Sequence, residues 1–221
     1  MAIGCGVLLL LARCALAAQS GEYGDFYYWT DGSSITIVQY TRCWPPSGDA
    51  VTIPDRIEGL PVTDIGGGAF WECYGPTSVE IPSSVTNILF QAFGFSSVRA
   101  LYFRGTPPRV DGGFLDGNVT AYYLPGTTGW GSTFAGRPTA LWALPNPVVL
   151  SLPPSFGMQT NQFGFVISWA TNASVVVEAC TDLAKPTWSA VGTNTLNEGW
   201  SYFSDPQWTN HPSRFYRIHS P

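Results

Sequence analysis

Short runs in which apolar and polar residues alternate make up most of the chain, and Gly, Pro, Asn and Asp separate them. Residues 25–30 and 34–40 are two such runs, with Asp31 and Gly32 between them. Alternation is typical of half-buried strands, and Asp-Gly is a strong signal of a tight hairpin turn. We therefore predict a β-hairpin that caps the following region, with the cap covering residues 18–50.

Two interlocked motifs recur after this hairpin. A V-x-I-P tetrad at residues 51–54 returns at residues 79–82, which is 28 residues later. Residues 62–70 align with residues 85–93 at an offset of 23, and both segments begin with V-T and end with A-F. A repeated unit of this size cannot bury its apolar face alone, so successive units stack around a shared core. The pattern predicts a short solenoid of parallel strands over residues 51–143.

These motifs resemble the BspA-like leucine-rich repeat of bacterial surface proteins. That repeat runs through an I-P tetrad and V-T-x-I-G-x-x-A-F, often with a Cys three residues after the Phe. Phe70 and Cys73 have this spacing, whereas Leu89 and Ser96 depart from the pattern in the second unit. Residues 122–130 resemble the terminal segment of such arrays. The resemblance covers over half of the chain, and it implies a solenoid fold and a binding or adhesion role at a bacterial cell surface.

A proline-rich stretch at residues 144–155 predicts a linker. Beyond it, short β-branched or aromatic runs predict a small antiparallel β-sandwich over residues 156–221, so the whole chain is expected to be mainly β. This segment also resembles a C-terminal β-module of exported bacterial proteins. The expected strands are Phe163 to Trp169, Ser174 to Ala179, Trp188 to Val191, Ser201 to Ser204 and Phe215 to His219.

The start of the chain has the features of a secretory signal peptide over residues 1–17. An apolar run at residues 7–12 is followed by Ala15 and Ala17, a small-x-small pattern that predicts cleavage after Ala17. We expect the protein to be secreted or on the cell surface. The mature chain has no apolar run long enough to span a membrane.

Three cysteines remain in the mature chain, namely Cys43, Cys73 and Cys180. An odd number cannot be fully paired, and the spacing does not fit a zinc site. We expect each cysteine to be a small buried hydrophobe. A bond between Cys43 and Cys73 in an oxidising compartment stays open.

The composition and motifs exclude several functional classes. The net charge of −5, with a pI near 4.8, argues against nucleic-acid binding, which calls for clustered Lys and Arg. No serine-hydrolase elbow, zinc-protease helix or phosphate-binding loop motif is present. Only His211 and His219 can act as neutral-pH bases, and neither belongs to a catalytic motif. We therefore expect no enzyme activity, no metal and no cofactor.

The repeat pattern nominates a ligand-binding surface instead. If Tyr122 points into the core with the other alternating apolar residues, then Thr52, Glu80, Tyr102 and Tyr123 point outward as one ladder. We predict that this ladder binds an extracellular protein or a polysaccharide. The alternative is that its two tyrosines only pack across neighbouring strands.

Two other functions remain open. Trp200, Tyr202 and Trp208 can stack on sugar rings, which would make the C-terminal region a carbohydrate-binding module, although aromatic residues in a small sandwich usually form its core. The protein can also be a structural component of an envelope or matrix that has no discrete ligand.

Overall fold

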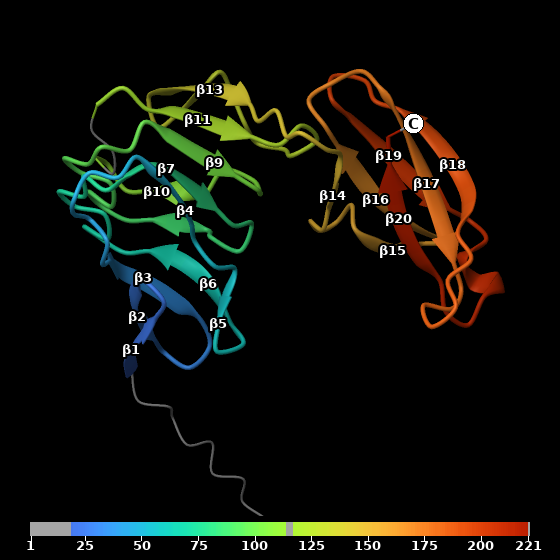
Figure 1. Ribbon diagram of the computed structural model, residues 1–221, viewed down its shortest axis with the longest axis horizontal. Helices are drawn as coiled ribbons and strands as arrows, with labels where there is room; N and C mark the ends of the chain where they lie inside the picture. The colour runs from blue at the N-terminus through green and yellow to red at the C-terminus, as the bar shows by residue number, and fades with distance from the viewer. Residues whose placement is uncertain (1–18, 114–116, 221) are drawn as a thin grey trace, which may run out of the picture.

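The computed structural model describes residues 19–113 and 117–220 and is mainly β. Its strands form two lobes, which we call the N-terminal lobe (residues 19–141) and the C-terminal lobe (residues 148–220) (Figure 1). The described residues contain no α-helix, and none of their helical turns could cross a membrane. The predicted signal peptide lies outside the described residues.

The first sheet of the N-terminal lobe contains the predicted hairpin. Asp31 Oδ1 accepts hydrogen bonds from the backbone amides of Ser33 and Ser34, which fixes the turn. An additional strand, β1, pairs with the hairpin; its sequence QSGEY has no apolar alternation, so the pattern did not predict it. The order is β1-β2-β3-β6-β8-β10, with β5 beside β6. These strands are β1 (Gln19–Tyr23), β2 (Phe26–Thr30), β3 (Ile35–Tyr40), β5 (Arg56–Ile57), β6 (Leu60–Ile65), β8 (Asn87–Ile88) and β10 (Arg109–Val110).

The second sheet of this lobe carries the repeated tetrads. Val51 pairs with Val79, which is the register that the tetrads predict. Five strands are parallel neighbours in the order β4-β7-β9-β11-β13, and β12 adds antiparallel to β13 at the edge. They are β4 (Asp49–Thr52), β7 (Pro76–Ile81), β9 (Ala100–Phe103), β11 (Thr120–Tyr123), β12 (Thr133–Phe134) and β13 (Arg137–Leu141).

Hydrogen bonds follow the 23-residue period of the second motif. The amide of Thr86 donates to the carbonyl of Thr63 at 2.8 Å, and the amide of Arg109 donates to that of Thr86 at 2.8 Å. Between the sheets, Phe70 and Phe93 stack with ring centroids 4.9 Å apart, and both are fully buried. Equivalent residues of successive units therefore lie on one another in the core.

The C-terminal lobe consists of two antiparallel sheets that enclose a small core. One sheet contains β14, β15, β16 and β19, and the other has the order β18-β17-β20. All five expected strands are present within a few residues of their predicted limits, and Phe165, Ile167, Val175, Val177, Leu196 and Phe203 are buried between them. The strands are β14 (Val148–Leu150), β15 (Gly157–Gln159), β16 (Gln162–Ser168), β17 (Ser174–Cys180), β18 (Ser189–Thr195), β19 (Trp200–Asp205) and β20 (Phe215–His219), and η1 (Trp208–Asn210) is a 3₁₀ turn.

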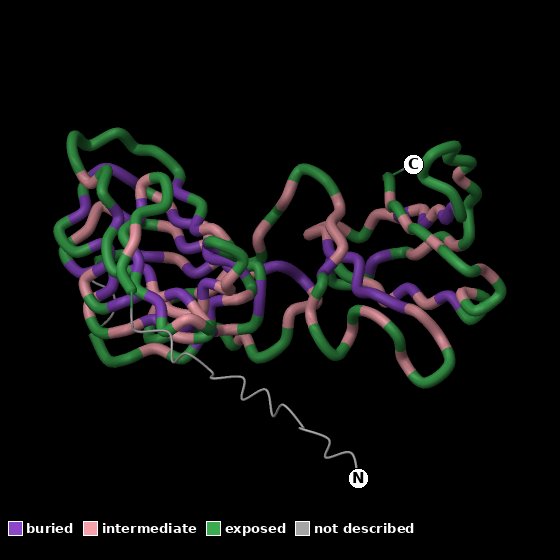
Figure 2. Tube along the Cα trace, turned by 90° about the horizontal axis from the view of Figure 1, so that it is seen from below, coloured by how far each residue is buried: buried purple, intermediate pink, exposed green. Residues whose placement is uncertain are grey.

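A packed junction connects the two lobes. The proline-rich stretch expected as a linker contains β14, which pairs with β16. Leu124, Leu150 and Val166 are buried together at this point, and the indole of Trp169 donates to the carbonyl of Leu144 at 3.0 Å. Figure 2 shows buried chain running from one lobe into the other. The connection is thus held by side-chain packing from both lobes.

The cysteines divide into a pair and a free thiol. Cys43 and Cys73 form a disulfide that joins residues 30 positions apart in the N-terminal lobe. Cys180 is a buried free thiol in β17. The expectation of a small buried hydrophobe is correct for Cys180, whereas for Cys43 and Cys73 the structure has the bond that the sequence left open. The turns of successive units bring these two residues side by side.

Candidate functional site

The predicted outward ladder is shifted by one residue in β11. Tyr102 pairs with Tyr122, and Tyr123 pairs with the buried Phe103. The inward position belongs to Ala121, which is fully buried. The sequence pattern placed Tyr122 inward because it is two residues from the buried Leu124, but Leu124 follows the end of the strand and belongs to the junction.

Three aromatic rings form a continuous cluster on this outer face. The rings of Tyr102 and Tyr122 are nearly parallel, with centroids 4.9 Å apart. Trp142, just after β13, lies 5.0 Å from Tyr102 and is partly buried against the junction. We call Tyr102, Tyr122 and Trp142, together with Arg104 and Glu80, the ladder face.

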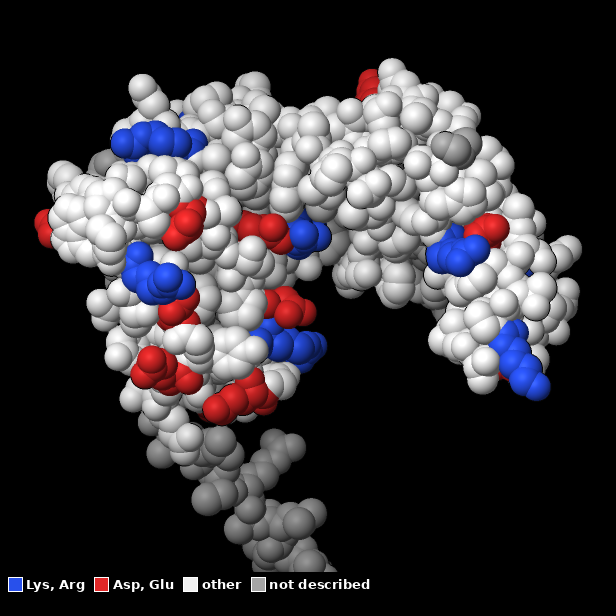
Figure 3. All heavy atoms as spheres, in the orientation of Figure 1, with Lys and Arg blue, Asp and Glu red and all other residues white. Residues whose placement is uncertain are grey.

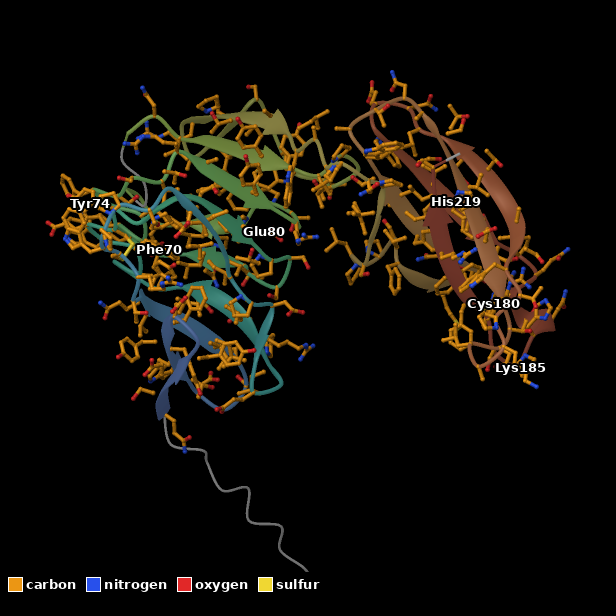
Figure 4. All side chains as sticks on the ribbon, viewed as in Figure 1. Phe70, Tyr74, Glu80, Cys180, Lys185 and His219 are labelled. Carbon is orange, nitrogen blue, oxygen red and sulfur yellow. A yellow bond between two sulfur atoms is a disulfide. The ribbon has the colours of Figure 1, made fainter. Side chains whose placement is uncertain are left out.

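The charged members of the ladder face neutralise each other. The guanidinium of Arg104 forms an ion pair with the carboxylate of Glu80. The same guanidinium lies over the ring of Trp142, 5.3 Å from its centroid. Figure 4 places Glu80 on the side of the N-terminal lobe toward the C-terminal lobe, and Figure 3 shows a hollow between the lobes below the junction. Glu80 and its ion pair thus lie toward this hollow, and the aromatic rings follow on the neighbouring strands up to Trp142 at the junction.

The other two residues of the predicted ladder, Thr52 and Tyr123, lie away from this aromatic cluster. Thr52 is in register with Glu80 and exposed, at the far end of the sheet from the tyrosines. Tyr123 stacks on Trp130 at 5.1 Å with the rings almost parallel, so its ring packs against the edge of the lobe. The sequence pattern did not nominate Arg104 or Trp142. The available signal was that Trp142 is an aromatic residue directly after the last repeat strand.

The aromatic residues nominated in the C-terminal lobe do not come together. Trp200 and Tyr202 are two residues apart on β19, so their side chains point to the same side of the strand. Tyr202 packs against the junction cluster. Trp208 lies in η1, whose coil Figure 1 shows at the end of the lobe remote from β14. The structure therefore separates Trp208 from the other two.

A buried polar network lies at that remote end. Asp205 is buried, pairs with Arg214 at 2.7 Å and accepts a hydrogen bond from the hydroxyl of Tyr216 at 2.9 Å. Burial, and then the hydrogen bond to Asp205, raise the pKa of Tyr216 well above its usual value. Because each of these buried polar groups has a partner, we infer that the network stabilises the fold of the lobe.

The two histidines lie apart from the ladder face, in the C-terminal lobe. His211 borders a hollow of about 250 Å³ with Cys180 and Arg214, and His219 lies 3.9 Å from Glu178. Within the described part of the chain, no three His, Cys, Asp or Glu side chains are grouped closely enough to hold a metal ion.

Comparison with known proteins gives partial matches. No family model and no curated protein matches the chain. A leucine-rich cell surface protein from Faecalibacterium prausnitzii A2-165 is 24% identical over 47% of this chain and 26% of its own, with a TM-score of 0.34. A leucine-rich repeat protein from T. pallidum is 28% identical over 38% of this chain and 43% of its own, with a TM-score of 0.30. These scores assign no family. The chain spans less than half of either structure, so the function is argued from its own residues.

Proposed function

We propose that this protein is a non-catalytic binding or adhesion protein, secreted or held at the cell surface, and that its ladder face recognises an extracellular protein. The observation that carries the proposal is the contact of Tyr102, Tyr122, Trp142 and Arg104 on one sheet face, where the rings are partly buried and Arg104 is exposed. Tyr, Trp and Arg are the residues most enriched among the energetic centres of protein interfaces.

The proposed compartment is supported by the disulfide. A bond between Cys43 and Cys73 persists in oxidising surroundings such as the cell exterior, where thiols are not kept reduced. The predicted signal peptide at residues 1–17 supports the same location.

We also propose the finer organisation of the chain. The parallel strands of residues 51–143 are turns of a leucine-rich-repeat solenoid of the BspA-like kind, the hairpin within residues 18–50 is its cap, and residues 156–221 are a β-sandwich. The regular 23-residue offsets of buried Phe and Ile residues support the solenoid. The enclosed core of two antiparallel sheets supports the sandwich.

A binding screen tests the proposed function. The mature chain is immobilised and exposed to extracellular-matrix proteins and to neutral and acidic polysaccharides, and dissociation constants are measured for each hit. We expect a protein ligand whose affinity falls at least tenfold in the Tyr102→Ala/Tyr122→Ala variant. The ladder rings are half-exposed, so the variant is expected to remain folded.

Tyr27→Ala is the matched control, because Tyr27 is an exposed tyrosine on β2 in the other sheet. A protein ligand that binds the double variant and the wild type equally would contradict the proposed site. Ordered self-assembly of the mature chain without any ligand would favour the structural role, and a polysaccharide lost only in Trp200→Ala would favour the carbohydrate module.

A further inference from the structure

Five exposed aromatic side chains gather on the edge of the N-terminal lobe formed by the return turns. They come from successive turns of the chain, whose backbones are hydrogen-bonded to one another, as in the bond from the Tyr74 amide to the Cys43 carbonyl at 3.0 Å. Figure 4 labels Tyr74 on the side of the lobe away from the C-terminal lobe, and Figure 3 draws uncharged surface there with acidic and basic side chains beside it. We call Trp44, Trp71, Tyr74, Phe90 and Phe95 the aromatic edge.

The disulfide positions one pair of these rings. Trp44 directly follows Cys43, and Tyr74 directly follows Cys73. Their ring centroids lie 5.5 Å apart at a tilt of 39°, although 70% of Trp44 is exposed. A covalent link one residue away from both rings limits how far they can separate.

A glycine and an unusual backbone conformation position the second pair. A Cβ at Gly94 would come within 2.7 Å of the Trp71 ring, so only glycine lets this ring lie against the neighbouring turn. Phe95 meets Trp71 edge-on at 4.8 Å and has a φ of 52°. That conformation costs a bulky residue roughly 1–2 kcal/mol. Glu72, 23 residues earlier, has a φ of 49°, so the conformation belongs to the repeated turn and fixes the place from which the Phe95 ring points outward.

Beside these rings lies a shallow, open hollow of about 540 Å³. Trp71 and Phe90 form its walls, and Gln91 and Asp111 border it. In the described structure, neither the Gln91 nor the Asp111 side chain has a hydrogen bond or ion pair. The hollow therefore combines aromatic walls with one amide and one carboxylate that are available to a ligand.

We propose that the aromatic edge is a binding site for a neutral polysaccharide, separate from the ladder face. A pyranose ring has flat C–H faces that match aromatic rings and a rim of hydroxyl groups. The Gln91 amide can donate to and accept from such hydroxyls, and the Asp111 carboxylate can accept from them. Rings from several successive turns provide consecutive contacts, which suits a chain of sugars better than one sugar.

Other occupants fit this surface less well. An acidic polysaccharide would bring like charge to Asp111, since the hollow has no basic residue in its lining. Neutral sugars match both the rings and the uncompensated hydrogen-bonding groups.

Affinity electrophoresis of the mature chain tests the proposal. Gels contain β-1,3-glucan, mannan or xylan as neutral probes and alginate as an acidic probe, and choline chloride is added as a competitor that binds aromatic cages. We expect at least one neutral probe to retard the protein, with a dissociation constant at least tenfold higher for Trp71→Ala and for Phe90→Ala. Phe90 is 56% exposed, so its variant stays folded even where Trp71→Ala does not.

Tyr27→Ala again serves as the control for removal of an exposed ring, and the Tyr102→Ala/Tyr122→Ala variant separates this site from the ladder face. Both are expected to bind the neutral probe like the wild type. The proposal is overturned if no neutral probe retards the protein, if retardation is equal in the Phe90 variant, or if alginate or choline binds instead. A dimer in solution that Phe90→Ala dissociates would equally overturn it, since a second copy would then cover the edge.

Discussion

At the residue scale, glycine marks the places where the chain packs most closely. Gly75 follows the disulfide-linked turn, and a Cβ there would lie 2.3 Å from the carbonyl oxygen of Arg42. Backbone cannot move aside as a flexible side chain can. We expect Gly75→Ala to lower the free energy of unfolding by about 1–3 kcal/mol.

Urea denaturation measures this effect. Gly112→Ala is the matched control, because nothing in the described structure lies within 4 Å of a Cβ at Gly112. The control should change the free energy of unfolding by less than about 0.5 kcal/mol. Equal values for the two variants would show that the turn near Arg42 is looser than described.

A titrating residue gives the second prediction. The raised pKa of Tyr216 lies above the value of about 10 of tyrosine in an unfolded chain. The neutral phenol therefore stabilises the folded state fully below pH 10, and this stabilisation is lost as the pH rises above 10. We expect Tyr216→Phe to cost about 0.5–1.5 kcal/mol at pH 7 and to lose less stability than the wild type between pH 10 and 11.

Thermal melting of the wild type and the Tyr216→Phe variant from pH 7 to pH 11 checks the direction of this pH dependence. The difference in melting temperature should shrink as the pH rises. Parallel curves across the whole range would mean that neither burial nor the hydrogen bond to Asp205 raises the pKa of Tyr216 in the folded protein.

At the element scale, the two kinds of aromatic stack differ in burial. Phe93 is fully buried and stacks on Phe70, whereas Tyr122 is half-exposed on the ladder face. We expect Phe93→Ala to lower the free energy of unfolding by about 3–5 kcal/mol, because it leaves a cavity between the sheets. Tyr122→Ala should cost less than about 1.5 kcal/mol, and chemical denaturation of both variants compares them. Similar losses would mean that the ladder rings are structural and not available to a ligand.

The elements also show what could be read from the sequence. The hairpin, the 23-residue offset and the five C-terminal strands followed from alternation and turn residues, because these depend on neighbours along the chain. The sequence did not predict which residues of β11 point inward, because the small Ala121 takes the inward position and Leu124 packs in the junction. The aromatic edge was missed for a similar reason. Its rings lie in the return turns, where the positive φ of Glu72 and Phe95 follows the 23-residue offset but the residue type does not. Alignment of the two units therefore shows no shared aromatic position there.

At the scale of the whole molecule, the disulfide is expected to contribute substantially to stability. It joins residues 30 positions apart, so it restricts the unfolded chain. We expect the Cys43→Ser/Cys73→Ser variant to lose about 2–4 kcal/mol of unfolding free energy. Chemical denaturation without reductant measures it, and a loss below about 0.5 kcal/mol would contradict a formed bond.

Thiol titration gives an independent count. The mature chain should show no reactive thiol when folded, because Cys180 is buried, and one thiol when denatured. Retention of residues 1–17 would add Cys5 and Cys14 and raise the denatured count. Reactivity of three thiols in the denatured mature chain would show that Cys43 and Cys73 are unpaired.

The junction between the lobes gives the last prediction. Leu150 is buried there with Leu124 and Val166, away from the cores of both lobes. We expect Leu150→Ser to loosen the junction and leave the two cores intact, because it removes apolar contact and adds a hydroxyl. Small-angle X-ray scattering should then show a larger radius of gyration with unchanged circular dichroism. An unchanged radius would mean that other contacts at the junction, such as the hydrogen bond from the Trp169 indole to the carbonyl of Leu144, hold the lobes.

The same junction has a consequence for what can reach the ladder face. Buried leucine and valine side chains join the two lobes, so the lobes keep a fixed separation, and Glu80 of the ladder face lies toward the opening between them. The junction therefore sets the width of the opening, and a partner cannot widen it without breaking apolar contacts. If the ladder face binds a protein as proposed, we expect the partner to enter this gap with a protruding loop or an extended segment rather than with the flat side of a folded domain.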